Sequence, residues 1–241
     1  QTVRFVGGCV RDSVAQRKFR EVDVATPDDP KTVSALLEAG GLKAIPTGIA
    51  HGTVSAMCGD RRFEITTLRV DVETTGRHAR IAFTDDWAAD AARRDFTMNA
   101  LYADPDGTLY DPTGGLEALE AGRIRFIGNP SQRIKEDYLR ILRFFRFYAH
   151  YGVQPADPTA MEACRRNASG LERLSGERIA HELQRILMAA DPAPVLRMMA
   201  AEEVLGRVVP EATNFDRLSR LTRRDTADPD AVRRLAAVMD G

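Results

Sequence analysis

The sequence predicts an α+β protein, in which a small mixed β-sheet with helices is followed by a part that is helical throughout. Two observations predict this class. Up to about residue 86, short β-like runs alternate with two helical stretches. After Gly128-Asn129-Pro130, nearly every segment has helical periodicity, and no internal repeat or low-complexity segment occurs.

Turn and capping signals define the elements of the first part. Gly7-Gly8 separates the first strand from a short helix at residues 9–15. Residues 26–30 (Thr-Pro-Asp-Asp-Pro) predict a turn and an N-cap for the next helix, residues 31–39. Strands are predicted at residues 3–6, 21–25, 42–46, 53–58 and 62–68.

The pattern then becomes helical, with one hairpin. The Ala-rich residues 87–98 predict a helix, and residues 101–111 predict a hairpin that turns at residues 104–107. Residues 111–115 are expected to form a loop. Further helices are predicted at residues 131–151, 159–167, 176–190 and 193–204. Residues 222–241 have the pattern of an element whose packing partners lie beyond the sequence.

Composition is that of a folded, cytoplasmic enzyme. Of 241 residues, 44% are hydrophobic and 29% charged, which excludes global disorder. No apolar run reaches the roughly 18 residues of a membrane helix, so no membrane partner is expected. The three cysteines, Cys9, Cys58 and Cys164, are far apart in sequence, which argues against a disulfide framework or a zinc site.

The charges are unevenly distributed along the chain. The net charge is −1, but residues 1–121 hold 14 basic and 19 acidic side chains, whereas residues 122–241 hold 20 and 16. Residues 123–146 hold seven basic side chains and two acids. A local basic stripe can bind a polyanion whatever the total charge, so nucleic acid is not excluded as a partner.

Gly7 and Gly8 form a candidate phosphate cradle. Without Cβ atoms the backbone can approach a phosphate closely, the first N–H groups of the following helix point at it, and Arg11 adds a positive charge. A plain turn is the alternative. Neither a Walker loop nor a GxGxxG sequence is present, which weighs against P-loop and dinucleotide sites.

Glu21 and Asp23 are a candidate pair of metal ligands. Residues two apart on a strand share one face, about 7 Å apart, where two carboxylates can hold Mg²⁺. Such pairs serve in-line phosphoryl or nucleotidyl transfer, in which metal ions activate the attacking hydroxyl and neutralise the leaving pyrophosphate. A solvated acidic strand face is the alternative interpretation.

Two further groups could contact a nucleotide. Arg94, Asp95 and Asn99 lie within about one turn of the predicted helix, where they could bind phosphate and ribose or merely cap the helix. Asp137 and Arg140 lie on the predicted helix 131–151 at i and i+3. Glu136 and Arg140 are an i, i+4 pair, so a surface salt bridge is the alternative there.

Taken together, the motifs resemble the bacterial tRNA nucleotidyltransferase and poly(A) polymerase family, the class II members of the DNA polymerase beta-like superfamily. The resemblance extends from Val3 to about Ala190. It depends on the motifs Gly-Gly-Cys-Val-Arg-Asp (7–12), Glu-Val-Asp-Val-Ala-Thr (21–26), His-Gly-Thr-Val (51–54), Phe-Glu-Ile-Thr-Thr-Leu-Arg (63–69), Gly-Arg-His-Ala (76–79), Arg-Arg-Asp-Phe-Thr-Met-Asn-Ala-Leu (93–101), Asp-Pro-Thr-Gly-Gly (111–115), Glu-Asp-Tyr-Leu-Arg (136–140) and Glu-Arg-Ile (177–179).

The resemblance implies a domain order and site roles. It implies a nucleotidyltransferase head at residues 1–125, a helical neck at 126–170 and a partial, truncated helical body at 171–241. Glu21 and Asp23 would be the catalytic acids that bind Mg²⁺. The nucleotide would be bound through its triphosphate, ribose and base by Gly7, Gly8, Arg11, Arg94, Asp95, Asn99, Asp137, Arg140 and Arg143.

The implied base readers agree with hydrogen-bond chemistry. Asp137 accepts and Arg140 donates, and both cytosine and adenine offer an amino donor beside a ring acceptor. Guanine and uracil place a carbonyl where Asp137 needs a donor, which sites of this kind reject by about 10⁴-fold. One Asp/Arg pair can therefore select C and A without a nucleic-acid template.

One residue departs from the family pattern, which normally has two aspartates. Glu21 occupies the first position, and its extra methylene moves the carboxylate by roughly 1 to 1.5 Å, so activity could be reduced or absent. Glu64 is either an additional acid near the metal ions or a structural hydrogen-bonding residue.

Among the family's activities, the sequence favours addition of C, C and A from CTP and ATP to the 3′ end of tRNA. Residues 47–54 are similar to CCA-adding members and lack the basic signature of poly(A)-adding relatives. Residues 71–79, with Gly76 and Arg77, resemble the flexible loop that switches those enzymes from CTP to ATP. The alternatives are a poly(A) polymerase, a relative that adds only CC or only A, and a noncatalytic RNA-binding module.

Overall fold

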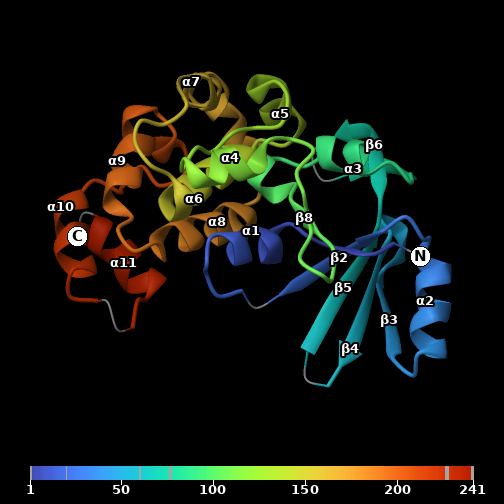
Figure 1. Cartoon of the computed structure of the whole chain (residues 1–241). Helices are drawn as coiled ribbons and strands as arrows, with labels where there is room; N and C mark the ends of the chain where they lie inside the picture. Colours follow the sequence, from blue (N-terminus) through green and yellow to red (C-terminus); the bar gives the residue numbers. More distant parts are fainter. Residues whose placement is uncertain (1, 20, 60, 76–77, 226–227, 240–241) are drawn as a thin grey trace. The chain divides into compact units, whose positions relative to one another are not determined.

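The computed structural model describes residues 2–19, 21–59, 61–75, 78–225 and 228–239. They form two compact units, residues 1–120 and 121–241, which are described separately (Figure 1). The division lies close to the boundary that we predict after residue 125. The further boundary between neck and body at residue 170 stays a prediction.

The first unit is built on a seven-stranded mixed sheet, which confirms the predicted class. Its order is β3-β4-β5-β2-β1-β8-β9. Only β2 and β5 are parallel among its described pairs. The strands are β1 (Arg4–Val6), β2 (Val22–Thr26), β3 (Lys43–Gly48), β4 (Thr53–Cys58), β5 (Arg61–Thr67), β8 (Tyr102–Ala103) and β9 (Leu109–Tyr110).

Two helices pack on this sheet. Helix α1 (Gly8–Val14) follows β1 and places Cys9 and Val10 in a core cluster with Leu101 and the β2 residue Val22. Helix α2 (Pro30–Ala39) begins where Asp29 accepts hydrogen bonds from the first backbone N–H groups, and it packs beside β3 and β4 (Figure 1). These elements are the ones that the turn signals predict.

A second, two-stranded sheet follows β5. Strand β6 (Arg69–Thr75) pairs antiparallel with β7 (His78–Phe83). The segment that resembles a nucleotide-switching loop, residues 71–79, is therefore mostly paired as a hairpin, and Gly76 and Arg77 lie outside the described residues.

The helix predicted at residues 87–98 is wrong beyond its first half. Helix α3 (Trp87–Ala92) ends before the nucleotide-binding candidates, and a 3₁₀ turn, η2 (Thr97–Asn99), follows it. Between them Phe96 is extended and fully buried, and its backbone N–H donates to the Asp95 carboxylate. Burial of Phe96 and this local hydrogen bond replace a turn of helix.

Helix α4 (Gly115–Glu120) is absent from the sequence prediction. Its first turn is held by Asp111, whose carboxylate accepts from the backbone N–H groups of Gly115 and Leu116 at 2.7 and 2.9 Å. Gly115 packs directly on η2, where a Cβ atom would collide with the Thr97 carbonyl. The Asp-Pro-Thr-Gly-Gly motif is thus the support of the turn that carries Asn99.

The second unit is helical in all its named elements, as predicted. They are α5 (Pro130–Glu136), α6 (Leu139–Tyr151), α7 (Pro158–Asn167), η3 (Ala168–Arg173), α8 (Gly176–Leu187), α9 (Ala193–Ala201), η4 (Leu205–Arg207), α10 (Phe215–Thr222) and α11 (Ala231–Val238). The buried face of α6 forms its core, with Phe144 stacked on Phe126. Arg146 of α6 and Glu182 of α8 form a buried ion pair at 3.0 Å.

The single helix predicted at residues 131–151 is wrong, because two helices occupy that range. The break lies at Asp137, which is extended (φ −154°, ψ 107°). Its carboxylate accepts from the backbone N–H of Leu139 and from Arg178, and the Tyr138 ring lies against Gly170. Contacts with residues distant in sequence therefore set the break, and helical periodicity alone gives no sign of it.

The expectation for residues 222–241 is also wrong in part, because helix α11 does have partners. It packs on α8 and α10. Arg234 is buried, and its guanidinium donates to the carbonyls of Leu187 and Ala189 and to Asp225. Val238 is buried as its pattern suggests, whereas Val232 is exposed.

Candidate functional site

Gly7 forms the turn between β1 and α1 that the sequence marks as a phosphate cradle. Its φ of +73° is disfavoured for residues with a side chain, and its backbone N–H donates to the Leu101 carbonyl at 3.1 Å. A Cβ atom at Gly7 would lie 3.6 Å from Nη1 of Arg94. The turn therefore brings the start of α1 next to one of the predicted phosphate ligands.

Arg11, Asn99 and Asp95 form one hydrogen-bonded chain. Nη1 of Arg11 donates to Oδ1 of Asn99 at 2.7 Å, and Nδ2 of Asn99 donates to Oδ1 of Asp95 at 3.0 Å. Asp12 accepts two further hydrogen bonds from the same guanidinium. Three residues predicted to bind nucleotide are thus brought together from two segments that are distant in sequence, and each is at most 9% exposed.

The predicted metal ligands lie on and beside β2. Asp23 pairs in register with Glu64 of the parallel strand β5, and Glu21 directly precedes β2. Val22 packs against α1, so its neighbour Asp23 points to the opposite face of the sheet. Residues that are paired in register on neighbouring strands share a face, so Glu64 lies on the same face as Asp23. Glu21, two residues before Asp23, also belongs to this face.

The electrostatics of Asp23 are those of a carboxylate among like charges. Burial raises its pKa above the ordinary value, and so do Glu64 and Glu21, whereas Arg94 opposes the shift. A site that leaves carboxylates short of positive charge suits a divalent cation, and Mg²⁺ usually takes one or two protein carboxylates together with substrate phosphates. Glu21 and Asp23 therefore fit Mg²⁺ by donor type.

Glu64 has a partner of another kind. Nη2 of Arg62 donates to it at 3.0 Å and also to Ser55. Within the part of the chain that the structure describes, no three acids, histidines or cysteines are grouped so that they could hold a metal ion. The arrangement favours the structural hydrogen-bonding role for Glu64 over that of an additional metal ligand.

Asp90 is a residue that the sequence analysis missed. It is 1% exposed and lies at i−3 and i−4 from Arg93 and Arg94, with which it forms ion pairs of 2.7 and 3.0 Å. Burial by itself would raise the pKa of Asp90, but Arg94 and Arg93 outweigh it and hold that pKa below the ordinary value. The i, i+3 and i, i+4 spacing in the printed sequence is the signal that could have found it.

The base readers are predicted in the second unit. Asp137 is held at both oxygens, by the Leu139 N–H at 3.2 Å and by Nη2 of Arg178 at 2.7 Å. Arg178 belongs to the Glu-Arg-Ile motif, for which the sequence alone predicts no role. Two donors keep this carboxylate an oriented acceptor, which is the property that base reading requires.

Arg140 and Arg143 have different surroundings. Arg140 forms an ion pair with Glu136 at the i, i+4 spacing seen in the sequence and donates to the Arg133 carbonyl, and its base-reading role stays a prediction. Arg143 lies over the Phe147 ring at 5.4 Å. Arg140 of α6 shares Glu136 with Arg133, so its guanidinium is held by residues of α5.

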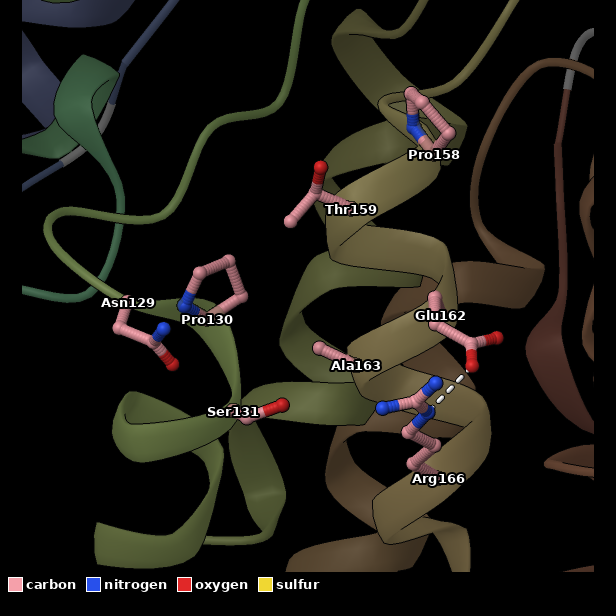
Figure 2. A pocket seen from close by; sticks show the side chains of 8 residues that line it. All are labelled: Asn129, Pro130, Ser131, Pro158, Thr159, Glu162, Ala163 and Arg166. Carbon is pink, nitrogen blue, oxygen red and sulfur yellow. Dashed lines mark hydrogen bonds and ion pairs between the residues drawn. The ribbon is translucent and has the colours of Figure 1, made fainter.

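A cavity of about 380 Å³ lies elsewhere in the second unit, between the start of α5 and α7. Figure 2 shows Asn129, Pro130 and Ser131 on one wall and the α7 side chains on the other, with Arg166 turned back toward Glu162. None of the predicted site residues lines it. The candidate site rests on the side-chain network instead of on this cavity.

Comparison with known families and proteins points in one direction. Residues 3–125 match the family described as the Poly A polymerase head domain, and residues 156–216 match the family described as the probable RNA and SrmB-binding site of polymerase A. The first match covers the whole sheet and the residues gathered around Gly7.

Similar individual proteins carry related names. The mitochondrial CCA tRNA nucleotidyltransferase 1 of Danio rerio is 44% identical over 82% of this chain and 46% of its own length. The CCA-adding enzyme of Anoxybacillus flavithermus is 32% identical over 95% of this chain and 57% of its own. The crystal structure of the Bacillus stearothermophilus CCA-adding enzyme in complex with CTP superposes with a TM-score of 0.78 at 32% identity, over 91% of this chain and 52% of that one. The chain thus spans about half the length of the curated relatives it matches.

Two further expectations concern the surroundings of the protein. Among the described residues, no helix is both long enough and apolar enough to cross a membrane.

The three cysteines are free thiols, and burial raises the pKa of Cys9 and of Cys164. Neither buried thiol is therefore a ready nucleophile.

Proposed function

The chain belongs to the poly(A) polymerase and tRNA nucleotidyltransferase family, and we propose that its activity is the addition of C, C and A to the 3′ end of tRNA. CTP and ATP are the substrates, and each step releases pyrophosphate. Two relatives named CCA tRNA nucleotidyltransferase or CCA-adding enzyme, at 44% and 32% identity, support this choice within the family. Because the chain spans about half of each, the activity of the whole protein is inferred here.

The observation that carries the proposal is the meeting of three features in the first unit. These are the backbone turn at Gly7, two arginines near that turn, and an acidic pair on the neighbouring strand. Positive groups suit the phosphates of a nucleotide, and the acids suit the cations that accompany it. Nucleotidyl transfer needs both in one place.

The side chains have distinct tasks in this proposal. Arg94 and the backbone at Gly7 and Gly8 bind the triphosphate. Arg11 donates a hydrogen bond to Asn99, which donates to Asp95, and this series of hydrogen bonds holds Asp95 in place beside the ribose. Glu21 and Asp23 would hold Mg²⁺, which supplies a lowered pKa for the attacking hydroxyl and charge neutralisation for the leaving pyrophosphate. Positioning and electrostatic stabilisation are the main contributions that a protein makes to this chemistry.

Base selection belongs to the second unit in the same proposal. Asp137, Arg140 and Arg143 are its residues, and Arg178 orients Asp137. A carboxylate fixed by two donors cannot easily turn away to relieve a clash with the carbonyl of uracil or guanine. The complex with UTP or GTP then contains an unpaired acceptor, which weakens binding of the wrong nucleotide.

Stepwise incorporation tests the proposal. We would incubate the protein with Mg²⁺ and three tRNA acceptors, which end before CCA, after the first C and after the second C. The expected result is CMP transfer to the first two acceptors, AMP transfer to the third, and a stop after A. Repeated AMP addition to any acceptor would indicate a poly(A) polymerase, and incorporation of one nucleotide type alone would indicate a CC- or A-adding relative.

Glu21 favours a second candidate function, an RNA-binding module without turnover. Its carboxylate reaches roughly 1 Å further than the aspartate usual at this position. If the site is active but imperfectly adjusted, Glu21→Asp should raise the rate of CMP transfer several-fold, whereas Glu21→Gln should abolish it. A chain that binds tRNA but transfers no nucleotide, even as Glu21→Asp, would establish the RNA-binding alternative.

The location that accompanies this proposal is the cytoplasm. It is supported by the free thiols, which are usual in reducing compartments. Some relatives are named as mitochondrial, so fractionation of cells carrying the tagged protein is the measurement that decides between the two.

A further inference from the structure

Asp90 collects hydrogen bonds from four residues. Its carboxylate accepts from the side chains of Arg93, Arg94 and Tyr102 and from the backbone N–H of Arg69, over 2.7 to 3.3 Å. The donors come from the two residues after α3, from β8 and from the start of β6. A buried carboxylate with this many partners has a single orientation.

Asp90 holds one edge of the Arg94 guanidinium, and the opposite edge therefore faces the Gly7 turn. Nε and Nη2 of Arg94 both donate to Oδ2 of Asp90, at 3.3 and 3.0 Å. Nη1 lies on the opposite edge, where it donates to the Asn99 carbonyl at 3.4 Å and lies 3.6 Å from the position that a Cβ atom at Gly7 would take. The Tyr102 ring lies under the same guanidinium at 5.4 Å, and its hydroxyl donates to Asp90.

We propose that Asp90 is a positioning residue for nucleotide binding, which aims Nη1 of Arg94 at the triphosphate in the Gly7 turn. The inference rests on the proposed function, because it takes Arg94 as a phosphate ligand. Asp90 is 1% exposed beneath its four donors, so its carboxylate is not accessible to a nucleotide. It acts through the direction it gives to Arg94.

A charge effect and a positioning effect of Asp90 predict opposite changes in CTP affinity when its carboxylate is removed. Arg93 and Arg94 share Asp90, so Asp90→Asn removes a negative charge beside two arginines. If Arg94 acted on the triphosphate through charge alone, CTP would bind more tightly to Asp90→Asn. If Asp90 positions Arg94, the same isosteric change weakens CTP binding, because the two-pronged hold on the guanidinium is lost.

The chain offers a matched control in its second unit. Asp225 is also buried, at 8% exposure, and also bridges two consecutive arginines, Arg233 and Arg234. Asp225→Asn therefore breaks the same kind of ion-pair network without touching a predicted site residue. Comparing the two variants separates a general loss of stability from an effect on nucleotide binding.

The experiment measures CTP and CMP affinity by titration calorimetry in the presence of Mg²⁺, with thermal unfolding as the folding check. Variants are Asp90→Asn, Arg94→Ala, their combination, and Asp225→Asn. We expect Asp90→Asn to weaken CTP about tenfold or more and CMP less than twofold, a size typical of removing the partner that orients a ligand group. In the Arg94→Ala background, Asp90→Asn should have no further effect on CTP.

The outcomes distinguish the positioning role of Asp90 from the proposed nucleotide transfer. Unchanged or tighter CTP binding by folded Asp90→Asn overturns the positioning role, as does an equal loss in Asp225→Asn. Should Asp90→Asn fail to fold, Asp90→Glu retains the charge but displaces the carboxylate, and wild-type CTP affinity in that variant overturns the role. Wild-type protein that binds CTP without transferring CMP overturns the transfer activity alone, whereas absence of CTP binding overturns both.

Discussion

Asp23 shows most clearly how single residues shape this site. Burial, Glu64 and Glu21 all disfavour its charged form, and Arg94 only partly compensates. A carboxylate in this position makes the folded state less stable at neutral pH than a neutral side chain would. Such a cost is expected where a group serves binding instead of stability.

The first prediction follows for Asp23→Asn. The substitution removes the repulsion with Glu64 and Glu21, so the melting temperature should stay the same or rise, while CMP transfer falls by at least about a hundredfold. Differential scanning calorimetry and the incorporation assay measure the two effects. A lower melting temperature together with retained transfer would show that Asp23 is a structural residue.

The second prediction concerns Asp137, at the same scale. The unchanged site is expected to prefer CTP over UTP by about 10⁴-fold, and Asp137→Ala should lower this preference at least tenfold. Binding of the triphosphate should weaken much less. Steady-state kinetics with each nucleotide measure it. Glu162→Ala, which removes a partly exposed carboxylate paired with Arg165 and Arg166, is the control. Unchanged selectivity in Asp137→Ala would refute base reading by this residue.

Single residues were predicted from the sequence where the motif itself carries the chemistry. The Gly7 turn and the Arg11, Asp95 and Asn99 group meet in the structure as one network. Asp90 and Arg178 were missed because their importance comes from what they hold in place. In the sequence, Asp90 is marked only by its i, i+3 and i, i+4 spacing to Arg93 and Arg94, which is also the spacing of ordinary surface ion pairs.

At the scale of elements, the short turn η2 depends on α4. Gly115, the first residue of α4, lies so close to η2 that any side chain would collide with the Thr97 carbonyl. Asp111 also holds this turn of helix, because its carboxylate accepts from the Gly115 N–H. The support of Asn99 is therefore a backbone contact that only glycine allows.

The third prediction tests this support. Gly115→Ala should destabilise the protein by about 1–3 kcal/mol, the usual cost of overpacking, and should also weaken CTP binding because η2 must shift. Gly206→Ala, where a Cβ atom would meet no neighbour, is the control. Urea unfolding and CTP titration provide the measurements, and a Gly115→Ala protein as stable as Gly206→Ala would contradict this packing.

Elements were predicted well where local signals decide them. Helices α2 and α7 begin at Asp caps followed by proline, and strand β4 matches its predicted range. Two predicted helices were too long, because Phe96 and Asp137 are held extended by burial and by partners far along the chain. Periodicity describes a helix face but does not register such tertiary contacts.

At the scale of the whole molecule, the charge distribution gave only a partial guide. The basic stripe at residues 123–146 suggested a surface for RNA, yet Arg133 and Arg140 are paired with Glu136, and Arg146 is buried against Glu182. Part of that stripe therefore stabilises the helical unit. Counting charges along a sequence does not reveal which of them are used internally.

The fourth prediction concerns acid stability. The pKa of Asp90 lies below its ordinary value in the folded protein, chiefly because Arg94 and Arg93 outweigh the effect of burial. Its contribution to the free energy of unfolding is therefore complete above about pH 4 and is lost as pH falls through the folded-state pKa. Asp90→Asn should show a flatter acid limb than the wild type in urea unfolding from pH 6 downward. Parallel stability curves for the two proteins would contradict this.

The proposed function requires that the protein selects C and A by itself and adds them in order to RNA. Sequencing the 3′ ends of tRNA that lacks CCA, after reaction with the protein, Mg²⁺ and all four nucleoside triphosphates, tests it most directly. We expect products that end in C, CC and finally CCA, with no U or G and no extension beyond A. Unchanged 3′ ends, or tails of repeated A, would contradict it.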